Sequence, residues 1–469
     1  MRNQLITIIK NISYSITANA LSLVTSIFMV LFVAKQFGVN EYGYWQLYLF
    51  YVSYAGFFTF GWVDGIYLRY GGKQYEDLNK TVFISQFWIM LLFEIIIAIG
   101  MILWSYTLPD IEKIYIFITF AINIVILSVR GIYVYVLQAT NHIKEFAYLT
   151  FIEKLVFIIL TIIILFFHYT DYHYLVIADL IGKTLSLVYT VYICRDLVFG
   201  KMASLQISLK EIWNNISVGS KLLIANIASM LIIGIVRYLI EMFWSIEVFS
   251  KVSLSLNISN MLIVFINAVG IVLFPMLKRI DYNKLSYLYS QLSTGLMVLL
   301  FVMLLTYYPA KIVLSTWLPQ YAESLKYLSL LFPICIFESK MSLLCNTYLK
   351  ALRKENILLV LNIVSVGISC ICSIFTIIIF RNIELAILTI TIVLGIRCYL
   401  SDIYIAYYFK HKIAKEIIIE VILISIFIIS SWFIDNAFST VIYFFALCLY
   451  LFYKKDSIID IIQKINNVN

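Results

Sequence analysis

Charged side chains are scarce in this sequence. They make up 13% of its 469 residues, which is about half of the share of roughly 25% in soluble globular proteins. They are absent from long apolar stretches and gathered in short polar ones, while hydrophobic residues reach 63%. This distribution excludes a soluble globular chain and is typical of membrane spans joined by short loops.

Residues that support metal, redox or nucleotide chemistry are also few. The seven cysteines lie in apolar segments without the CxxC spacing of a zinc site, and the four histidines are scattered. Gly182-Lys183-Thr184 resembles the end of a phosphate-binding loop, but the glycine required earlier is replaced by Ile177. We therefore expect no cofactor and no metal, and every loop is too short for a soluble catalytic domain, so we expect no enzyme.

Apolar runs of spanning length follow one another along the whole chain. They lie at 14–36, 45–68, 81–105, 114–138, 147–168, 173–195, 217–240, 250–277, 287–310, 324–350, 357–380, 385–409, 416–434 and 438–453. The sequence therefore predicts an all-α membrane protein with about 14 transmembrane helices, the last two of which form a hairpin added to a set of twelve.

Positive charge is distributed unevenly between alternate loops. Most of the 34 Lys and Arg residues lie in the loops on the side of the N-terminus. The opposite loops hold only Lys35, Lys113, Lys251, Lys311, Lys326 and Arg381. Because Lys and Arg are enriched in cytoplasmic loops, both termini are predicted to be cytoplasmic. The net charge of +8 thus reflects topology, and we expect no nucleic-acid partner.

Short motifs recur with a six-span period. Asn11-Ile12-Ser13 precedes the first span and Asn215-Ile216-Ser217 the seventh, while Leu137-Gln138-Ala139 follows the fourth and Leu349-Lys350-Ala351 the tenth. The alternative is chance similarity in a biased composition. A parallel repeat predicts two six-helix lobes around a central cavity. The expected domains are 1–195, a cytoplasmic linker helix at 196–216 with a capping box at Ser208 and Glu211, 217–410, and a hairpin with a short tail at 411–469.

Amide and hydroxyl side chains form single stripes on three spans. Ser15, Asn19, Ser22 and Ser26 share one face of the first span, and Ser253, Asn257, Asn260 and Asn267 share one face of the eighth. Asn226 and Arg237 share a face of the seventh. We predict that these faces line the cavity. Tight packing between helices through small polar residues is the alternative.

Ionisable residues within the spans are the main functional signal, because a charge in a bilayer is energetically costly and usually marks a functional position. The predicted cargo-binding set is Arg130, Lys154, Lys221, Arg237, Lys340 and Arg397, together with Asn19, Asn226, Asn257, Asn260 and Asn267. The candidate ion-coupling carboxylates are Asp64, Glu94, Glu153, Asp179, Glu338 and Asp402. The alternative is that they form interhelical salt bridges. Asp179 and Lys183 have the i, i+4 spacing of an ion pair within one helix, and we predict that they neutralise each other.

Several motifs resemble bacterial Wzx-type polysaccharide flippases. They are Phe37-Gly38-Val39-Asn40-Glu41-Tyr42-Gly43 after the first span, the segment from Gly61 to Arg69, Leu137-Gln138-Ala139, and Leu273 to Arg279. The resemblance implies the multidrug/oligosaccharidyl-lipid/polysaccharide (MOP) exporter superfamily, a MATE-like fold with two lobes, and a cavity that is often cationic. Twelve spans are common in that family, so the last two are a departure, and we assign them no role in transport.

The resemblance further implies a cargo of undecaprenyl-pyrophosphate-linked oligosaccharide, flipped across the bacterial inner membrane during O-antigen, lipopolysaccharide or capsule biosynthesis. Membrane lipids, a polysaccharide polymerase and a chain-length regulator are the expected partners. Three alternatives stay open: an exporter of drugs or organic cations, a membrane polysaccharide polymerase or glycosyltransferase, and a lipid II flippase. An acidic cavity would favour the first, and a large external loop or an acidic catalytic motif would favour the second.

Overall fold

The described residues of this computed structural model, 20–277, 282–434 and 436–466, contain helices and connecting turns and no strand. The predicted all-α class is therefore confirmed. The contacts divide the chain into two compact units, Met1–Ile227 and Ala228–Asn469.

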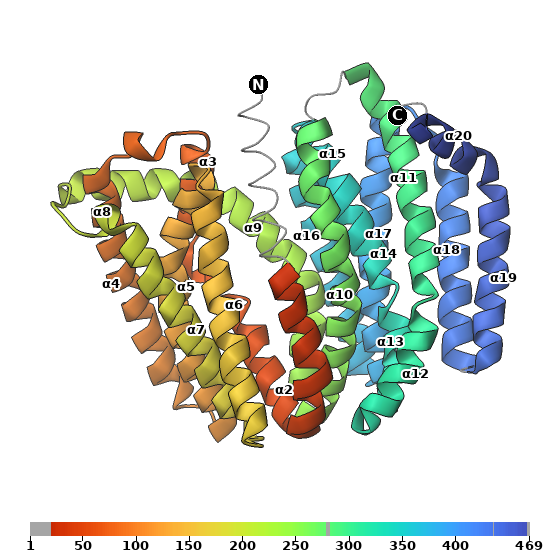
Figure 1. Ribbon diagram of the computed structural model, residues 1–469, viewed down its shortest axis with the longest axis horizontal. Coiled ribbons are helices and arrows are strands. Elements are labelled where there is room, and N and C mark those ends of the chain that lie inside the picture. Colours follow the sequence, from red (N-terminus) through yellow and green to blue (C-terminus); the bar gives the residue numbers. More distant parts are fainter. Residues whose placement is uncertain (1–19, 278–281, 435, 467–469) are drawn as a thin grey trace. The chain divides into compact units, whose positions relative to one another are not determined.

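Helix α5 is the central element of the first unit, because it packs against α2, α3, α4, α6 and α7 (Figure 1). The elements are η1 (Met29–Val33), α2 (Ala34–Val52), η2 (Ala55–Thr59), α3 (Trp62–Tyr70), η3 (Tyr75–Asp77), α4 (Lys80–Ser105), α5 (Ile111–Ala139), α6 (Ile143–Phe166), α7 (Tyr172–Ile193), α8 (Arg195–Val198) and the first part of α9 (Leu205–Phe243). The core of this unit therefore forms around one long helix.

The span Leu325–Ala351 is the core of the second unit, since 89% of its most apolar stretch is buried. The elements after α9 are α10 (Ile246–Leu277), α11 (Tyr282–Leu304), α12 (Tyr307–Trp317), η4 (Pro319–Tyr321), α13 (Leu325–Leu331), α14 (Ile334–Lys340), η5 (Met341–Cys345), α15 (Asn346–Ala351), α16 (Glu355–Ser373), η6 (Ile374–Ile379), α17 (Ile383–Tyr408), α18 (Ala414–Ile429), η7 (Ser430–Ile434), α19 (Ala437–Tyr453) and α20 (Lys455–Asn466). Helices α10, α11 and α17 pack against this central span.

The helices match the predicted spans closely. Eleven helical runs in the described residues are long and apolar enough to cross a membrane, and Ala437–Tyr453 is a shorter apolar helix. The first run, Ala20–Thr59, contains two helices that meet at Gly38, whose φ of 75° and ψ of 172° interrupt the helix. A glycine adopts this φ without the strain that a Cβ would cause. The chain is a multi-pass membrane protein, and a sharp turn replaces the predicted first outer loop.

The predicted repeat has a counterpart in local geometry. Helices α5 and α15 end at Ala139 and Ala351, and Asn141 and Arg353 follow with φ of 63° and 56°. After the first helix, the His142 backbone N–H donates to the Leu137 carbonyl over 2.8 Å, and after the second, the Lys354 backbone N–H donates to the Leu349 carbonyl over 2.8 Å. Asn141 and Arg353 donate in turn to the Gln138 and Lys350 carbonyls over 3.3 Å and 3.1 Å, which completes the Schellman arrangement that terminates helices. Asn11-Ile12-Ser13, the other half of the predicted repeat, lies outside the described residues.

Helix α9 begins at Leu205 and runs without a break to Phe243. Ser208 lies inside it and donates a hydrogen bond of 3.0 Å to the Ser204 carbonyl. The predicted capping box at Ser208 and Glu211 is therefore wrong, because the N-cap must precede the first helical residue. The stretch from Leu205 onward continues directly into the following span.

The early part of α9 packs tightly against α3. A Cβ on Gly65 would lie 1.9 Å from the Asn215 carbonyl oxygen, and one on Gly219 would lie 1.9 Å from the Gly61 carbonyl oxygen. Arg69 and Glu211 form an ion pair of 2.8 Å beside this contact. Small residues allow helices in membranes to approach so closely, so these glycines hold α9 against α3.

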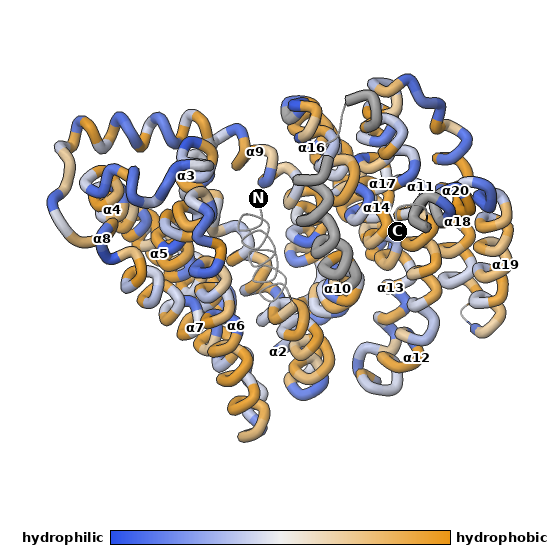
Figure 2. The backbone as a smooth tube through the Cα atoms, turned by 45° about the horizontal axis from the view of Figure 1, so that its top comes forward, coloured by the Kyte–Doolittle hydropathy of each residue, from blue (hydrophilic) through white to orange (hydrophobic). Residues whose placement is uncertain are grey.

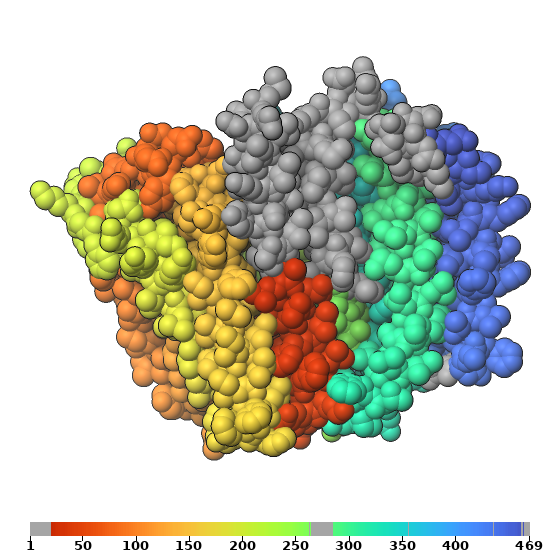
Figure 3. All heavy atoms as spheres, viewed as in Figure 1, coloured from red at the N-terminus to blue at the C-terminus, as the bar shows by residue number. Residues whose placement is uncertain are grey.

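Helices α18 and α19 form the predicted C-terminal hairpin. Asn436 caps α19 by accepting a hydrogen bond of 2.9 Å from the Phe438 backbone N–H. Hydrophobic residues predominate along α19, and hydrophilic residues gather around α20 (Figure 2). The hairpin lies beside α11 on the face drawn in Figure 3, and α11 contacts both α19 and α20. The hairpin is therefore an integrated part of the second unit.

We predict that Gly65→Ala lowers the free energy of unfolding by about 1–3 kcal/mol, because the added methyl group overpacks the α3–α9 contact. Thermal unfolding in detergent measures the effect. The control is Gly100→Ala, since no atom lies within 4 Å of the position of its Cβ. There the better helix propensity of alanine leaves stability unchanged or raises it by up to about 1 kcal/mol. Equal melting temperatures for both variants would contradict the close contact.

Asp196 lies outside the spans in α8 and pairs with Lys80 across 2.9 Å. Burial acts to raise the pKa of Asp196, but hydrogen bonds from Lys80 and Tyr75 outweigh it and hold the pKa below its usual range. A depressed folded-state pKa means that the ionised group stabilises the fold above the unfolded value of about 3.9. This stabilisation disappears as the pH falls through the folded-state value.

We therefore predict that acidification below about pH 4 lowers the melting temperature of the wild type more than that of Asp196→Asn. Melting curves across this pH range make the comparison. Glu76→Gln, which removes an exposed carboxylate from the neighbouring loop, is the control and should follow the wild type. Identical acid dependence of the wild type and Asp196→Asn would show that this ion pair does not contribute.

Candidate functional site

Four buried side chains form a closed polar network in the first unit. Lys183 on α7 lies 2.5 Å from Asp179 and donates over 2.9 Å to the amide oxygen of Asn123 on α5. Tyr48 on α2 donates over 2.6 Å to Asp179 and accepts over 2.8 Å from Asn123. The predicted pairing of Asp179 with Lys183 is confirmed. Each charge is compensated, so this network joins three helices without a surplus of either sign.

A second cluster in the first unit holds two cations and one carboxylate. Glu153 on α6 pairs with Arg130 on α5 and, across 2.9 Å, with its neighbour Lys154. The side chains of Arg130 and Glu153 are 11% and 10% exposed, and that of Lys154 is 30% exposed. The cluster therefore carries one positive charge beyond what Glu153 neutralises, and Lys154 keeps part of its surface accessible.

Two further predicted carboxylates of this unit are buried. Asp64 on α3 is 7% exposed, and Glu94 on α4 is fully buried. Neither carboxylate oxygen of Glu94 has a hydrogen-bond partner within the described residues, although Ser128 on α5 lies near it. An ionised carboxylate without partners is very costly in an apolar setting. Glu94 is thus suited to carry a proton.

In the second unit, Lys340 lies between two carboxylates. Its Nζ lies 2.6 Å from Asp402 on α17 and 3.2 Å from Glu420 on α18. Tyr289 on α11 donates a hydrogen bond to the other oxygen of Asp402. All four side chains are buried or nearly so. This cluster joins four helices and carries one negative charge beyond that of Lys340 when both carboxylates are ionised.

The remaining predicted cations of the second unit also have partners. Arg397 on α17 pairs with Glu338 on α14 across 3.3 Å. Arg237 on α9 donates over 3.0 Å to the Ser253 hydroxyl and lies 5.1 Å from the centre of the Phe249 ring. Glu338 and Lys340 thus both have partners on another helix, although they lie two residues apart on α14.

The predicted polar stripes divide between buried and exposed positions. Ser253 is buried, Asn257 is half-buried, and Asn260, Asn226 and Lys221 are exposed. Asn19 and the side chain of Asn267 lie outside the described residues. The faces of these spans thus offer amides at the surface of each unit, and their role in a cavity stays a prediction.

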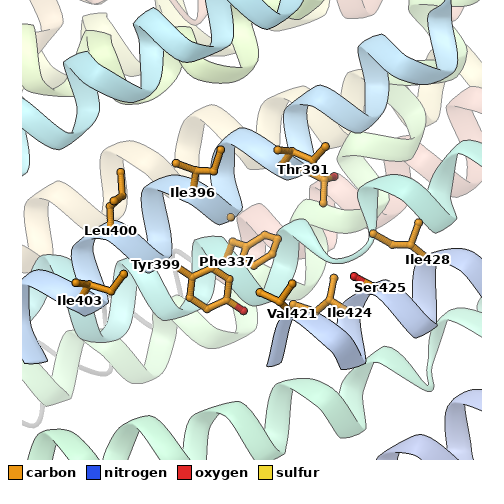
Figure 4. Close-up of a pocket in the computed structure, with 12 residues that line it drawn as sticks. Phe337, Thr391, Ile396, Tyr399, Leu400, Ile403, Val421, Ile424, Ser425 and Ile428 are labelled. Carbon is orange, nitrogen blue, oxygen red and sulfur yellow. The ribbon is translucent and has the colours of Figure 1, made fainter. Parts of the chain in front are cut away.

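An apolar pocket of about 390 Å³ lies in the second unit between α17 and α18 (Figure 4). Its walls are almost entirely hydrocarbon, and the Phe337 ring from α14 lines the pocket where it packs next to Gly395. Ile396, Leu400 and Ile403 come from α17, and Val421, Ile424 and Ile428 from α18. A pocket with such walls fits an alkyl or isoprenoid chain.

Glu420 is the main residue that the sequence analysis missed. It lies in the 416–434 span, which was interpreted as an addition to the family pattern without a role in transport. The available signal was a carboxylate within a predicted span, the same signal that identified Asp402. In the described residues no three His, Cys, Asp or Glu side chains lie close enough together to hold a metal ion.

No protein-family model and no curated protein matches the sequence. Solved structures do match. The lipid II flippase MurJ in an inward closed conformation aligns with a TM-score of 0.67 and 14% identity, covering 96% of this chain and 100% of that chain. An inward-facing MATE-family multidrug resistance transporter of the MOP superfamily aligns with a TM-score of 0.61 and 12% identity, covering 83% of this chain and 94% of that chain. An outward-facing MATE transporter aligns with a TM-score of 0.53 and 13% identity, covering 86% of this chain and 96% of that chain.

The chain has the fold of MurJ and MATE transporters. This confirms the predicted MATE-like fold class, while a likeness to Wzx proteins in particular stays an expectation from the sequence. The match to MurJ leaves only 4% of this chain uncovered, so it includes at least part of the α18–α19 hairpin. At least part of the added hairpin is therefore shared with a solved structure of this fold.

We predict that Lys183→Met lowers the free energy of unfolding by about 3–5 kcal/mol, because Asp179 is left as an uncompensated buried charge. The double variant Asp179→Leu, Lys183→Met should recover most of this loss. Unfolding in mixed micelles with increasing denaturing detergent measures both. The control is Lys251→Ala, whose partner Glu247 is half-exposed and whose ion pair is worth less than about 1 kcal/mol. A small effect of Lys183→Met would show that Asp179 is stable without its partner.

Proposed function

We propose that this protein is a flippase for undecaprenyl-pyrophosphate-linked oligosaccharides, the subunits of O-antigen or another surface polysaccharide. It would move them from the cytoplasmic to the outer leaflet of the bacterial inner membrane by alternating access, with both termini in the cytoplasm. The observation that carries the proposal is the cluster of Arg130, Glu153 and Lys154. It leaves a cation without a full counter-charge inside the span region of a MurJ- and MATE-like fold.

A pyrophosphate group fits the chemistry of this cluster. Arginine binds phosphate oxygens through two parallel N–H donors, and lysine adds a mobile point charge. Arg130 and Lys154 share one carboxylate, so an incoming anion would complete the charge balance. Lys340 and Arg397 are less suitable, because buried carboxylates already compensate them. The exposed Lys221 is a further candidate contact.

The lipid part of the cargo would use different surfaces. A polyprenyl chain is apolar and needs no wet path, whereas the glycan must stay hydrated. The pocket between α17 and α18 offers hydrocarbon walls for a segment of the chain. The exposed amides of Asn226 and Asn260, with Asn257 and Asn267, are proposed contacts for sugar hydroxyls. A polysaccharide polymerase and a chain-length regulator would receive the flipped product.

Coupling to an ion gradient is part of the proposal. Glu94 has no hydrogen-bond partner for its carboxylate in the described part of the chain, and neutralisation by a proton would remove the cost of its burial. Asp64 is a second buried carboxylate of the same unit. Binding and release of protons at such groups would supply the driving force, since the sequence holds no nucleotide motif.

Lipid II is a second candidate cargo. The likeness to a lipid II flippase over 96% of this chain favours it. The two cargoes share the polyprenyl pyrophosphate and differ in the sugar and peptide part, so the proposed pyrophosphate site serves both. An assay with both cargoes decides between them.

The test is binding of an undecaprenyl-pyrophosphate trisaccharide to the purified protein in nanodiscs. We expect Arg130→Ala and Lys154→Ala each to weaken binding about tenfold or more, because a hydrogen bond to a charged group contributes about 1.5–3 kcal/mol. Arg130→Lys should fall between the wild type and Arg130→Ala, since it keeps the charge and loses the fork of donors. Lys251→Ala is the matched control.

Parallel titrations separate the alternatives. Unchanged affinity in both alanine variants would overturn the proposed site. Binding of tetraphenylphosphonium instead of the glycolipid, abolished by Glu153→Gln, would favour an exporter of organic cations. Preference for lipid II over the trisaccharide carrier would favour the second cargo. Flipping by the wild type in proteoliposomes, followed with a fluorescent carrier, completes the assay.

A further inference from the structure

We propose that Lys340, Asp402 and Glu420 form a proton-binding site in the second unit, and that proton binding there loosens the hold of α14 and α17 on α18. The proposal rests on contacts within this unit and does not depend on the identity of the cargo.

The number of charges is the first reason. Lys340 is the single cation in contact with Asp402 and Glu420 among the described residues, and the exposed fractions of the three side chains are 2%, 5% and 6%. Two ionised carboxylates and one ammonium leave a buried negative charge, which is very costly at membrane depth. One bound proton makes the cluster neutral.

The geometry selects Glu420 as the carboxylate that binds the proton. Asp402 is contacted from two sides, by Lys340 at 2.6 Å and by the hydroxyl of Tyr289. Glu420 has the longer contact of 3.2 Å with Lys340, made through one oxygen. The anion with fewer and longer hydrogen bonds is the easier one to protonate.

Titratable groups from several elements surround Glu420, and Lys412 lines the same cavity. Lys340 comes from α14, Asp402 and Tyr399 from α17, and Glu416 from the preceding turn of α18. Glu416 is itself paired with Lys454 across 2.6 Å. With Lys340 shared between two anions, these neighbours favour neutralisation of Glu420.

Two buried tyrosine hydroxyls, one of them on α19, indicate that Glu420 can take a second position. The Tyr450 hydroxyl is buried and has no hydrogen-bond partner in the described ranges, and it interacts electrostatically with Glu420. The Tyr399 hydroxyl on α17 is likewise without a described partner. Unsatisfied buried hydroxyls are rare in native proteins. Both are placed to bond a rearranged Glu420.

A polar cavity of about 80 Å³ connects the cluster to the end of the spans. It is lined by Tyr289, Lys340, Asp402, Glu416 and Glu420, and by the 411–413 turn between α17 and α18. His411 in this turn is exposed and lies 2.7 Å from the Ser286 hydroxyl. The cavity is large enough to hold water molecules, so protons have a path from the exposed turn to Glu420.

Proton binding would change how α18 is held. An ionised Glu420 can leave Lys340 only by separating opposite charges at low dielectric, which is costly. A neutral Glu420 can leave at much lower cost, and its hydrogen bond to Lys340 is weaker than the charged one. Val421, the next residue, lines the apolar pocket together with Tyr399. Release of α18 would therefore widen the pocket between α17 and α18.

The experiment uses the full chain in nanodiscs without cargo. Spin labels on Leu385→Cys and Ile429→Cys, two exposed positions on α17 and α18, report the helix separation. Cys370 and Cys448, the exposed native cysteines, are replaced by alanine in this background. We expect the distance distribution to shift to longer values on acidification. Glu420→Gln, which resembles the protonated state, should show the longer distance at every pH.

Glu247→Gln is the matched control. It removes a half-exposed carboxylate on α10, and its distances should follow those of the wild type. Infrared titration of the unlabelled protein supplies a second readout: one of the carboxylic acid bands that grow on acidification should be missing in Glu420→Gln and present in Glu247→Gln. A distance independent of pH, or identical acid bands in the wild type and Glu420→Gln, would overturn the proposal. Neither outcome bears on glycolipid binding at Arg130 and Lys154.

Discussion

Compensation of charge at membrane depth is the constraint on which this structure depends. A bilayer offers no water to solvate an ionised side chain, so each buried charge needs a charged partner or a proton. Lys183 and Asp179 meet this requirement within α7, and Arg397 with Glu338 and Lys340 with Asp402 meet it between helices. The two interhelical pairs join helices that apolar packing alone would leave free to slide or rotate.

Each unit contains one buried cluster whose charges do not balance, and the two clusters have opposite sign. The first unit contains a cluster with a surplus cation, Arg130 and Lys154 around Glu153. The second contains a cluster with a surplus carboxylate, Asp402 and Glu420 around Lys340. A surplus cation attracts an anionic cargo group, and a surplus carboxylate attracts a proton. In the proposed transport cycle, the first cluster would bind the anionic group of the cargo and the second would bind the proton.

The position of Glu420 changes the interpretation of the α18–α19 hairpin. By family resemblance, the last two helices were an addition to a twelve-span transporter. In the structure, α18 contributes an acid to the core of the second unit and one wall of the apolar pocket. The coverage of the MurJ match agrees with a hairpin that belongs to the fold. A charged residue within a span thus indicated better than the number of spans that the hairpin belongs to the second unit.

Some features of the fold were predictable because they depend on local sequence. Apolar length and the positions of charges identified nearly every span, and the paired motifs ending at Ala139 and Ala351 marked the same helix-ending turn in both units. The capping box at Ser208 failed because α9 already begins at Leu205, and it packs against α3 where Gly65 meets Asn215. A local motif does not report contacts with a distant helix.

The sequence by itself determined the class of protein, the spans and the kinds of residue at membrane depth. Burial in a bilayer acts on each segment separately, so hydropathy is sufficient for these features. Only the tertiary structure decided which charges meet. Lys340 and Glu420 are 80 residues apart, and Asn123 and Lys183 are 60 apart. Their contacts arise from the packing of several helices at once, and no pattern along one helix encodes that packing.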